Sequence, residues 1–192
     1  MRELEVRQAV RDKLRGLYQG DPRTRVVEEM GVWSGSVRVD VAVINGELSA
    51  FELKSERDTL ERLPKQAELY NQVFDRVTLV SASRHLSKAL SCIPEWWGVL
   101  AAEMQDGHVR LYEERGSGIN PGIDSIQVAR LLWRDEALDI LVRHGIERGV
   151  KSKRAELIYS RMAESLTLET ICHEVRESLK KRSGWLRNCV SD

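Results

Sequence analysis

Two carboxylates and a lysine lie close together in the segment that runs from Arg38 to Lys54. Asp40 stands in an alternating run of valines, and Glu52 and Lys54 follow it with one apolar residue between them. Carboxylate oxygens are hard ligands that hold Mg²⁺, and an ammonium group can stabilise phosphate charge or help to activate water. This set of side chains is therefore suited to metal-dependent hydrolysis of a phosphodiester bond.

The elements that must position these groups are two strands of a hairpin. Residues 37–44 alternate between valine and other residues, which predicts a strand, and Asn45-Gly46 predicts a turn into a partner strand over residues 47–54. A strict two-residue turn would place Glu52 and Asp40 on opposite faces of the sheet. We therefore predict a bulged hairpin with a three-residue loop over residues 44–46 and a left-handed Gly46. This register puts four polar residues on one face and six apolar ones on the other: Arg38, Asp40, Glu52 and Lys54 against Val37, Val39, Val41, Val43, Phe51 and Leu53.

An ordinary explanation of the same residues stays open. Asp40, Glu52 and Lys54 can also be the solvated alternation of an exposed sheet face, and charged alternation of this kind is common. The position of the three residues favours a site, because Glu52 and Lys54 end a β-rich strand that is followed by a predicted helix.

The order Asp40, Glu52, Lys54 resembles the motif of the PD-(D/E)XK nuclease superfamily, with Val39 in place of its proline. Gln66 and Tyr70 are spaced by one helical turn, so they share a helix face. They resemble the Gln-x-x-x-Tyr element of the RecB-like branch, in which the glutamine faces the active site and the substrate. Core packing is the alternative role for Tyr70. The segment from residue 3 to about residue 85 is similar to an uncharacterised bacterial family within this superfamily.

The resemblance implies a restriction-endonuclease-like fold and a DNA endonuclease that depends on Mg²⁺, or on Mn²⁺. It implies that Asp40 and Glu52 hold the metal, together with the backbone carbonyl of Leu53 and an acid from the N-terminal helix. Glu5 is preferred over Glu3 for that acid because Glu5 lies closer to the apolar stripe, although both can simply complement the helix dipole.

Further roles follow from the same resemblance. Lys54 orients or deprotonates water, or stabilises the charge of the transition state. Gln66 completes the catalytic group and, with Tyr70, contacts nucleic acid. Beside these two residues, Arg57, Ser55 and Lys65 are additional candidates for phosphate contacts in nucleic-acid binding, although each of them also suits a solvated position.

The remaining periodicity predicts an α/β (α+β) fold with a central mixed sheet flanked by helices. Helices are expected over residues 2–17, from residue 58 or 59 to 74, and over residues 84–92. Further strands are expected over residues 24–30, 76–81, 96–103 and 108–113, with Asp106-Gly107 turning between the last two.

A Gly-, Ser- and Pro-rich stretch over residues 115–122 predicts a boundary between a nuclease-like domain, 1–118, and an all-helical domain, 124–192. Residues 134–146 and 149–158 resemble a SAP-type DNA-binding element, with the basic cluster Lys151, Lys153 and Arg154 before a helix N-terminus. A small helical bundle with solvated basic ends is the equal alternative.

Composition bounds these expectations. The 192 residues are 42% hydrophobic, which is enough for a core, and they carry no net formal charge, so a basic surface must be local. Three scattered cysteines and the absence of a long apolar run predict a cytoplasmic protein without membrane contact. We expect a nuclease of DNA repair or of defence against foreign DNA. Homodimerisation and an RNA substrate stay open, and a catalytically silent nucleic-acid-binding or adaptor protein is the alternative.

Overall fold

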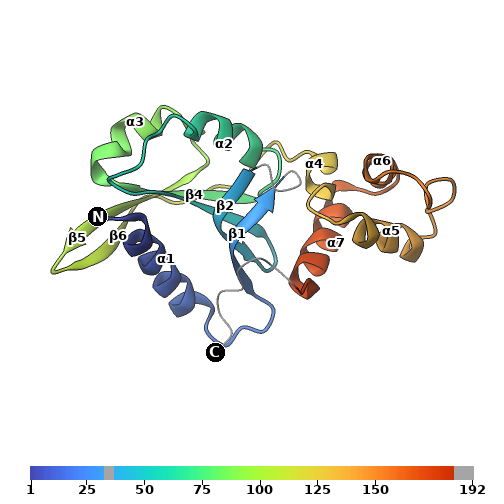
Figure 1. The fold of residues 1–192 in the computed structure, drawn as a ribbon, viewed down its shortest axis with the longest axis horizontal. Coiled ribbons are helices and arrows are strands. Elements are labelled where there is room, and N and C mark those ends of the chain that lie inside the picture. The colour runs from blue at the N-terminus through green and yellow to red at the C-terminus, as the bar shows by residue number, and fades with distance from the viewer. Residues whose placement is uncertain (33–36, 184–192) are drawn as a thin grey trace.

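The structure, a computed structural model, describes residues 1–32 and 37–183 and is built around a six-stranded mixed sheet (Figure 1). Its strands lie side by side in chain order: β1 (Arg25–Val32), β2 (Val37–Ile44), β3 (Leu48–Lys54), β4 (Arg76–Ala82), β5 (Gly98–Gln105) and β6 (His108–Arg115). The central pairs β3–β4 and β4–β5 are parallel, and the other neighbours are antiparallel. The predicted α+β class with a mixed sheet and flanking helices is confirmed.

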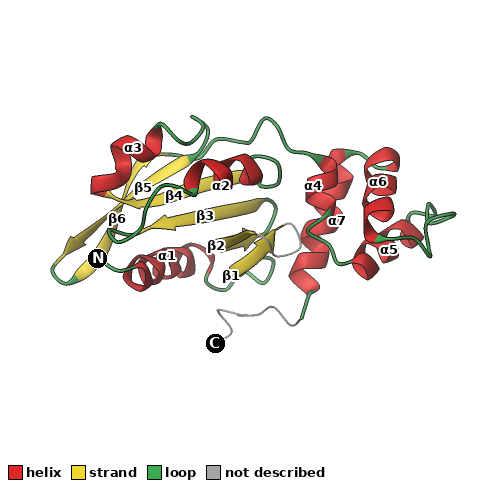
Figure 2. Cartoon of the chain, turned by 45° about the horizontal axis from the view of Figure 1, so that its top comes forward, coloured by secondary structure: helices red, strands yellow, loops and turns green. Residues whose placement is uncertain are grey.

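Helices cover both faces of this sheet, as Figure 2 shows. The long helix α1 (Glu3–Tyr18) lies on one face, where Val6, Val10 and Leu14 are buried against residues of β2 to β5. The other face is covered by α2 (Leu63–Tyr70), the short 3-10 turn η1 (Ser83–His85) and α3 (Leu86–Leu90). The active-site candidates on β2 and β3 therefore lie between α1 and α2.

Helix α2 is shorter than the sequence predicts. Pro64 lies in its first turn, as expected, because a proline has no N–H to donate there. Residues 55–62 form turns instead of helix, and the Asp58 carboxylate accepts hydrogen bonds from both the backbone N–H and the hydroxyl of Ser55 at 2.7 Å. A side chain that bonds to nearby backbone in this way competes with helix formation.

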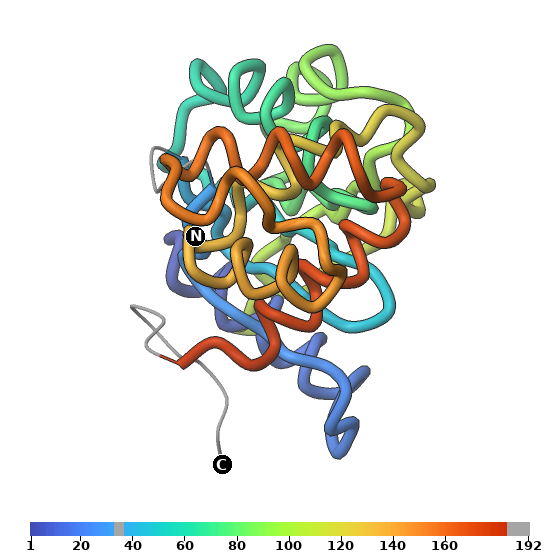
Figure 3. The backbone as a smooth tube through the Cα atoms, turned by 90° about the vertical axis from the view of Figure 1, so that its right-hand side faces the viewer, coloured from blue at the N-terminus to red at the C-terminus, as the bar shows by residue number. Residues whose placement is uncertain are grey.

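The C-terminal helices α4 (Ser125–Ala129), α5 (Arg134–Arg143), α6 (Ala155–Ser165) and α7 (Leu168–Lys181) pack at one end of the sheet (Figures 1 and 3). Their buried residues, such as Ile140 and Val175, belong to the same hydrophobic cluster as Ile44 and Phe74 of the sheet half. The stretch predicted as a linker is fixed in place, since the amide of Asn120 donates to the carbonyls of residues 71 and 74. The two predicted domains thus share one core.

The β2–β3 hairpin has the face parity that the sequence predicts, but by a different loop. Ile44 pairs with Leu48 and Val41 with Phe51, so the loop covers residues 45–47 rather than 44–46. The predicted left-handed Gly46 is wrong, because Gly46 is not among the described glycines with positive φ. The Asn45 side chain shapes the loop instead by accepting from the N–H of Glu47 at 2.9 Å.

The predicted apolar face of β2 is wrong in its first half. Val41 and Val43 pack beneath α1 as expected, whereas Val39 belongs to the cluster on the opposite face of the sheet. The change of side occurs at Asp40, next to Glu29 of β1, whose φ of 53° is a left-handed conformation that non-glycine residues rarely adopt. The strand distortion therefore lies at the candidate catalytic aspartate itself.

Candidate active site

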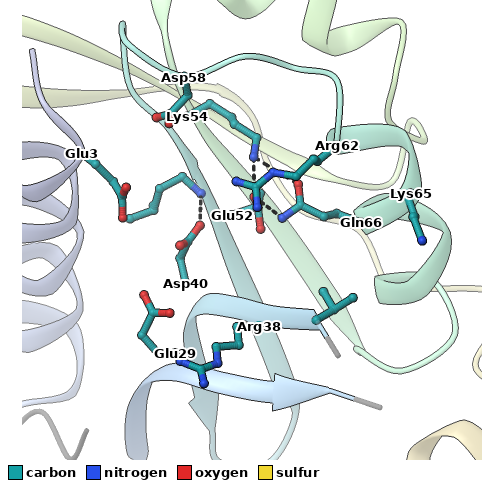
Figure 4. A pocket seen from close by; sticks show the side chains of 12 residues that line it. Glu3, Glu29, Arg38, Asp40, Glu52, Lys54, Asp58, Arg62, Lys65 and Gln66 are labelled. Atoms are coloured by element: carbon teal, nitrogen blue, oxygen red, sulfur yellow. Dashed lines mark hydrogen bonds and ion pairs between the residues drawn. The ribbon is translucent and has the colours of Figure 1, made fainter. Parts of the chain in front are cut away.

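A cavity of about 660 Å³ opens where β2 and β3 separate, between the start of α1 and the start of α2 (Figure 4). We call it the central cavity. It brings together most of the residues predicted for catalysis and adds charged neighbours to them. Its lining is Glu3, Glu29, Val37, Arg38, Asp40, Glu52, Leu53, Lys54, Asp58, Arg62, Lys65 and Gln66.

Glu52 and Lys54 form a buried ion pair on the α2 side of the cavity. Their residues are 1% and 3% exposed, and Lys54 Nζ lies 2.6 Å from Glu52 Oε1. The amide of Gln66 donates to the same oxygen at 2.7 Å and accepts from Lys54 Nζ at 3.1 Å. The hydroxyl of Tyr70 donates to Glu52 Oε2 at 2.8 Å. A buried charge pair is costly unless further hydrogen bonds satisfy it, and Gln66 and Tyr70 provide these bonds.

Tyr70 acts in this network as a neutral donor. Burial raises the pKa of its hydroxyl well above the ordinary value, and the negative charge of Glu52 raises it further. The same hydroxyl also lies 3.1 Å from the backbone carbonyl of Arg38, so it connects α2 to the start of β2.

Asp40 lies between the two sides of the cavity. Its Oδ2 accepts from the N–H of Leu53 at 2.8 Å, and its Oδ1 accepts from Arg7 Nη2 at 3.0 Å. Burial raises the pKa of Asp40 to about 7, with repulsion from Glu52 adding to it and the Leu53 and Arg7 contacts opposing it. Asp40 therefore changes its charge near neutral pH.

Asp40 also belongs to an acidic cluster with Glu3 of α1 and Glu29 of β1. One carboxylate oxygen from each residue lies within 4.8 Å of the others. A single magnesium ion holds oxygens at about 2.1 Å, so its ligands lie at most about 4.2 Å apart, and Ca²⁺ allows slightly more. The all-oxygen donor set thus fits a hard divalent cation: a spread of 4.8 Å is within the range of Ca²⁺, whereas Mg²⁺ requires the three carboxylates to move closer together. Glu52 does not belong to this cluster, in contrast to the predicted ligand set.

Comparison with known proteins identifies the family to which the chain belongs. The family model of bacteriophage P4 protein cII matches residues 1–189. The chain belongs to this cII family. Protein cII of Enterobacteria phage P4 is 29% identical over 157 residues, which cover 82% of this chain and 59% of that protein. The chain thus matches less than two thirds of that relative's length. Among solved structures, a protein of unknown function from Silicibacter pomeroyi is similar with a TM-score of 0.48 and 19% identity, covering 80% of this chain and 96% of that one.

In this member of the cII family, the acid that α1 contributes to the cavity is Glu3 and not Glu5. The carboxylate of Glu5 instead accepts from the backbone N–H of Arg2 at 2.5 Å, so it caps the start of the helix. A signal for Glu3 is present in the sequence, because Glu3 and Arg7 are spaced for an ion pair along one helix face.

Arg57 is not part of the cavity lining, and its predicted contact with nucleic acid stays a prediction. It is exposed in the turn after β3, whereas Arg62 and Lys65 at the start of α2 line the central cavity. Glu29, Arg62 and Arg7 are members of the site that the sequence pattern does not indicate. Glu29 has no detectable signal, because its side chain reaches the cavity through an unusual backbone conformation.

The basic cluster Lys151, Lys153 and Arg154 lies on the loop between α5 and α6, away from α1 and the central cavity (Figure 1). These side chains are exposed, and the carbonyls of the two lysines accept from Arg134 at 2.8 and 3.1 Å. The cluster is therefore a separate surface of the molecule.

Within the described residues, no helix is both long and apolar enough to cross a membrane.

Proposed function

We propose that the chain is a metal-dependent nuclease that hydrolyses phosphodiester bonds in DNA, in repair or in defence against foreign DNA. The observation that carries the proposal is the convergence of Asp40, Glu52, Lys54 and Gln66 on one cavity. Tyr70 supports it, since it bonds to the same carboxylate as Lys54 and Gln66. The resemblance to the PD-(D/E)XK superfamily gives this group of residues its expected chemistry.

The acidic cluster Glu3, Glu29 and Asp40 is the proposed place of the metal ion. A divalent ion there would lower the pKa of a bound water and neutralise phosphate charge. Glu52 takes the role of a positioning residue, because its oxygens accept from Lys54, Gln66 and Tyr70.

Lys54 is the proposed electrostatic group of the reaction. Its ammonium is held by Glu52 and Gln66 before any substrate arrives, so little reorganisation accompanies its interaction with a phosphate. Arg38, Arg62 and Lys65 line the same cavity and supply positive charge for the phosphates of a nucleic acid backbone. A symmetric cut of both strands of a duplex would require a second copy of the chain.

A second candidate has one specific observation in its favour. The guanidinium of Arg7 lies among the three carboxylates of the acidic cluster, where it already balances part of their charge. This arrangement also suits a protein that binds nucleic acid with a nuclease fold but without cleavage.

Incubation of plasmid DNA and of an RNA oligonucleotide with Mg²⁺ or Mn²⁺, and with EDTA, tests the proposal. We expect metal-dependent cleavage of DNA that falls by about a hundredfold or more in Asp40→Asn, Glu52→Gln and Lys54→Met. Asp12→Asn and Lys13→Met are matched controls, since both residues are exposed on α1. Cleavage that survives all three cavity substitutions contradicts the assignment. Salt-dependent binding of DNA without cleavage supports the second candidate.

A further inference from the structure

Arg7 lies beside the central cavity and contacts three of the carboxylates that line it. Its Nη2 lies 2.5 Å from Glu3, 2.9 Å from Glu29 and 3.0 Å from Asp40, so one nitrogen contacts carboxylates from α1, β1 and β2. Its Nη1 also donates to the backbone carbonyl of Asp40 at 3.1 Å. The residue is only 8% exposed. Figure 4 shows the three carboxylates pointing toward one region of the cavity.

The guanidinium is a permanent charge at this position. Burial lowers the pKa of Arg7, but the hydrogen bond to Glu3 and the charges of Asp40 and Glu29 raise it by more. An arginine side chain is not deprotonated in proteins. It can leave the carboxylates only by moving, and the flexible stem of the side chain allows such a movement.

The acidic cluster does not suit two cations at once. Nη2 contacts one carboxylate oxygen of each of the three residues that form the cluster expected to hold a metal, so an ion would compete with the guanidinium for the same carboxylates. A divalent ion beside a fixed guanidinium would also meet a like charge at short range, which is unfavourable in a partly buried place.

We propose that Arg7 competes with the divalent metal ion for Glu3, Glu29 and Asp40, and that its guanidinium leaves the acidic cluster when the metal binds. Arg7 then stabilises the cluster without metal and sets the metal affinity of the cavity. This inference rests on the proposed metal-dependent function. If Arg7 neither competed with the ion for these carboxylates nor repelled it, its removal would leave metal affinity unchanged or weaken it.

Calorimetric titration of the full chain with Mn²⁺ tests the competition. We expect Arg7→Met and Arg7→Gln to bind Mn²⁺ about tenfold more tightly than the unsubstituted chain, within the range usual for coupled sites. Arg11→Met is the matched control, because Arg11 lies one turn along α1 and pairs at 3.3 Å with Glu28, outside the cavity lining. Its Mn²⁺ affinity should stay within about twofold of the unsubstituted value.

A second measurement keeps the test decisive if the Arg7 variants unfold. In the chain labelled with ¹⁵N-arginine, addition of Mg²⁺ should shift the side-chain Nε–Hε signal of Arg7 and leave that of Arg11 in place. Unchanged or weaker affinity in both Arg7 variants, an unmoved Arg7 signal at saturation, or the absence of metal binding overturns the proposal. Cleavage assays are independent of these readouts. Tighter Mn²⁺ binding by the Arg7 variants without any cleavage of DNA supports the competition and contradicts the nuclease proposal. Cleavage of DNA with unchanged Mn²⁺ affinity in the variants supports the nuclease proposal and contradicts the competition.

Discussion

Asp40 of the central cavity and Glu174 of α7 are both largely buried carboxylates that contact arginine, yet their acidities shift in opposite directions. Burial raises the pKa of Asp40 to about 7, and the charge of Glu52 adds to the effect. Burial also raises the pKa of Glu174, but hydrogen bonds from Arg143 and His144 lower it by more, so the pKa ends below its ordinary value.

The difference comes from the ratio of acids to cations. Glu174 receives two hydrogen bonds from Arg143, at 3.0 and 2.8 Å, and one contact from His144 at 2.8 Å. Asp40 must share Arg7 with Glu3 and Glu29, and it faces Glu52 as well. The helical region thus satisfies its buried acid. Around Asp40, three carboxylates share the one guanidinium of Arg7, and the pKa of Asp40 is raised as a result of burial and of the nearby charge of Glu52. A carboxyl with a perturbed pKa in a cavity is typical of a functional site.

The largest expected effect is a difference in the free energy of unfolding lost when a buried acid is removed from the central cavity or from the helical region. Glu52→Ala leaves the buried ammonium of Lys54 without its carboxylate, and we expect a loss of about 3–5 kcal/mol in the free energy of unfolding. Glu174→Ala should cost only about 1–2 kcal/mol, because the Arg143 side chain is 56% exposed and can be solvated.

Urea unfolding at pH 7 measures both variants. The double variant Glu52→Ala with Lys54→Met should recover part of the loss, because it removes the unpaired charge as well. Equal losses at Glu52 and Glu174 would remove the distinction between the two regions.

A smaller change in stability, a gain instead of a loss, is expected when Asp40 is replaced, and it depends on pH. Because the pKa of Asp40 is higher in the folded chain than in the unfolded chain, its ionisation lowers stability as pH rises from about 4 to about 7. Asp40→Asn removes this penalty. The variant should be more stable than the unsubstituted chain by about 1–2 kcal/mol at pH 8, with little difference at pH 4.

Glu174→Gln should show the reverse dependence. A lowered pKa contributes stability that is present above the unfolded pKa and is lost as pH falls through the folded pKa. This variant should therefore be less stable than the unsubstituted chain near neutral pH and equal to it in strong acid. Thermal unfolding across this pH range gives both curves, and parallel curves for the Asp40 and Glu174 variants would contradict the comparison.

Local pattern is enough to predict the α2 side of the cavity. Alternation and turn signals indicate the strands, and face parity requires Asp40 and Glu52 to share a side, which the pairing of Val41 with Phe51 satisfies. One helical turn between Gln66 and Tyr70 then brings both side chains to Glu52. Each of these relations depends only on the period of one element or on the register of one hairpin.

The α1 side could not be predicted in the same way. Glu29 reaches the cavity because its φ of 53° breaks the regular strand, and nothing in the periodicity marks that break. Arg7 meets Glu29 and Asp40 only through the packing of α1 across two strands. The geometry favours Glu3 over the predicted Glu5, because Glu3 lines the cavity whereas the carboxylate of Glu5 caps the helix start.

The smallest effect concerns the basic cluster of the helical region. Replacing Lys151, Lys153 and Arg154 with serine should leave stability within about 0.5 kcal/mol, because all three side chains are exposed. If this surface binds DNA, the affinity falls in the variant. The dependence of log affinity on log salt then becomes shallower by about 0.9 for each phosphate that the protein no longer neutralises.

Fluorescence anisotropy with a short duplex at several salt concentrations measures that slope. A control triple variant replaces three exposed cations of the sheet half with serine: Lys13, Lys88 and Arg110. A slope that changes only in the first variant assigns DNA binding to the helical region in addition to its packing role. Equal changes in both variants indicate non-specific attraction, since any three surface charges then have the same effect on DNA affinity. In that case the helical region has only a packing role, and a specific binding site is expected only at the central cavity.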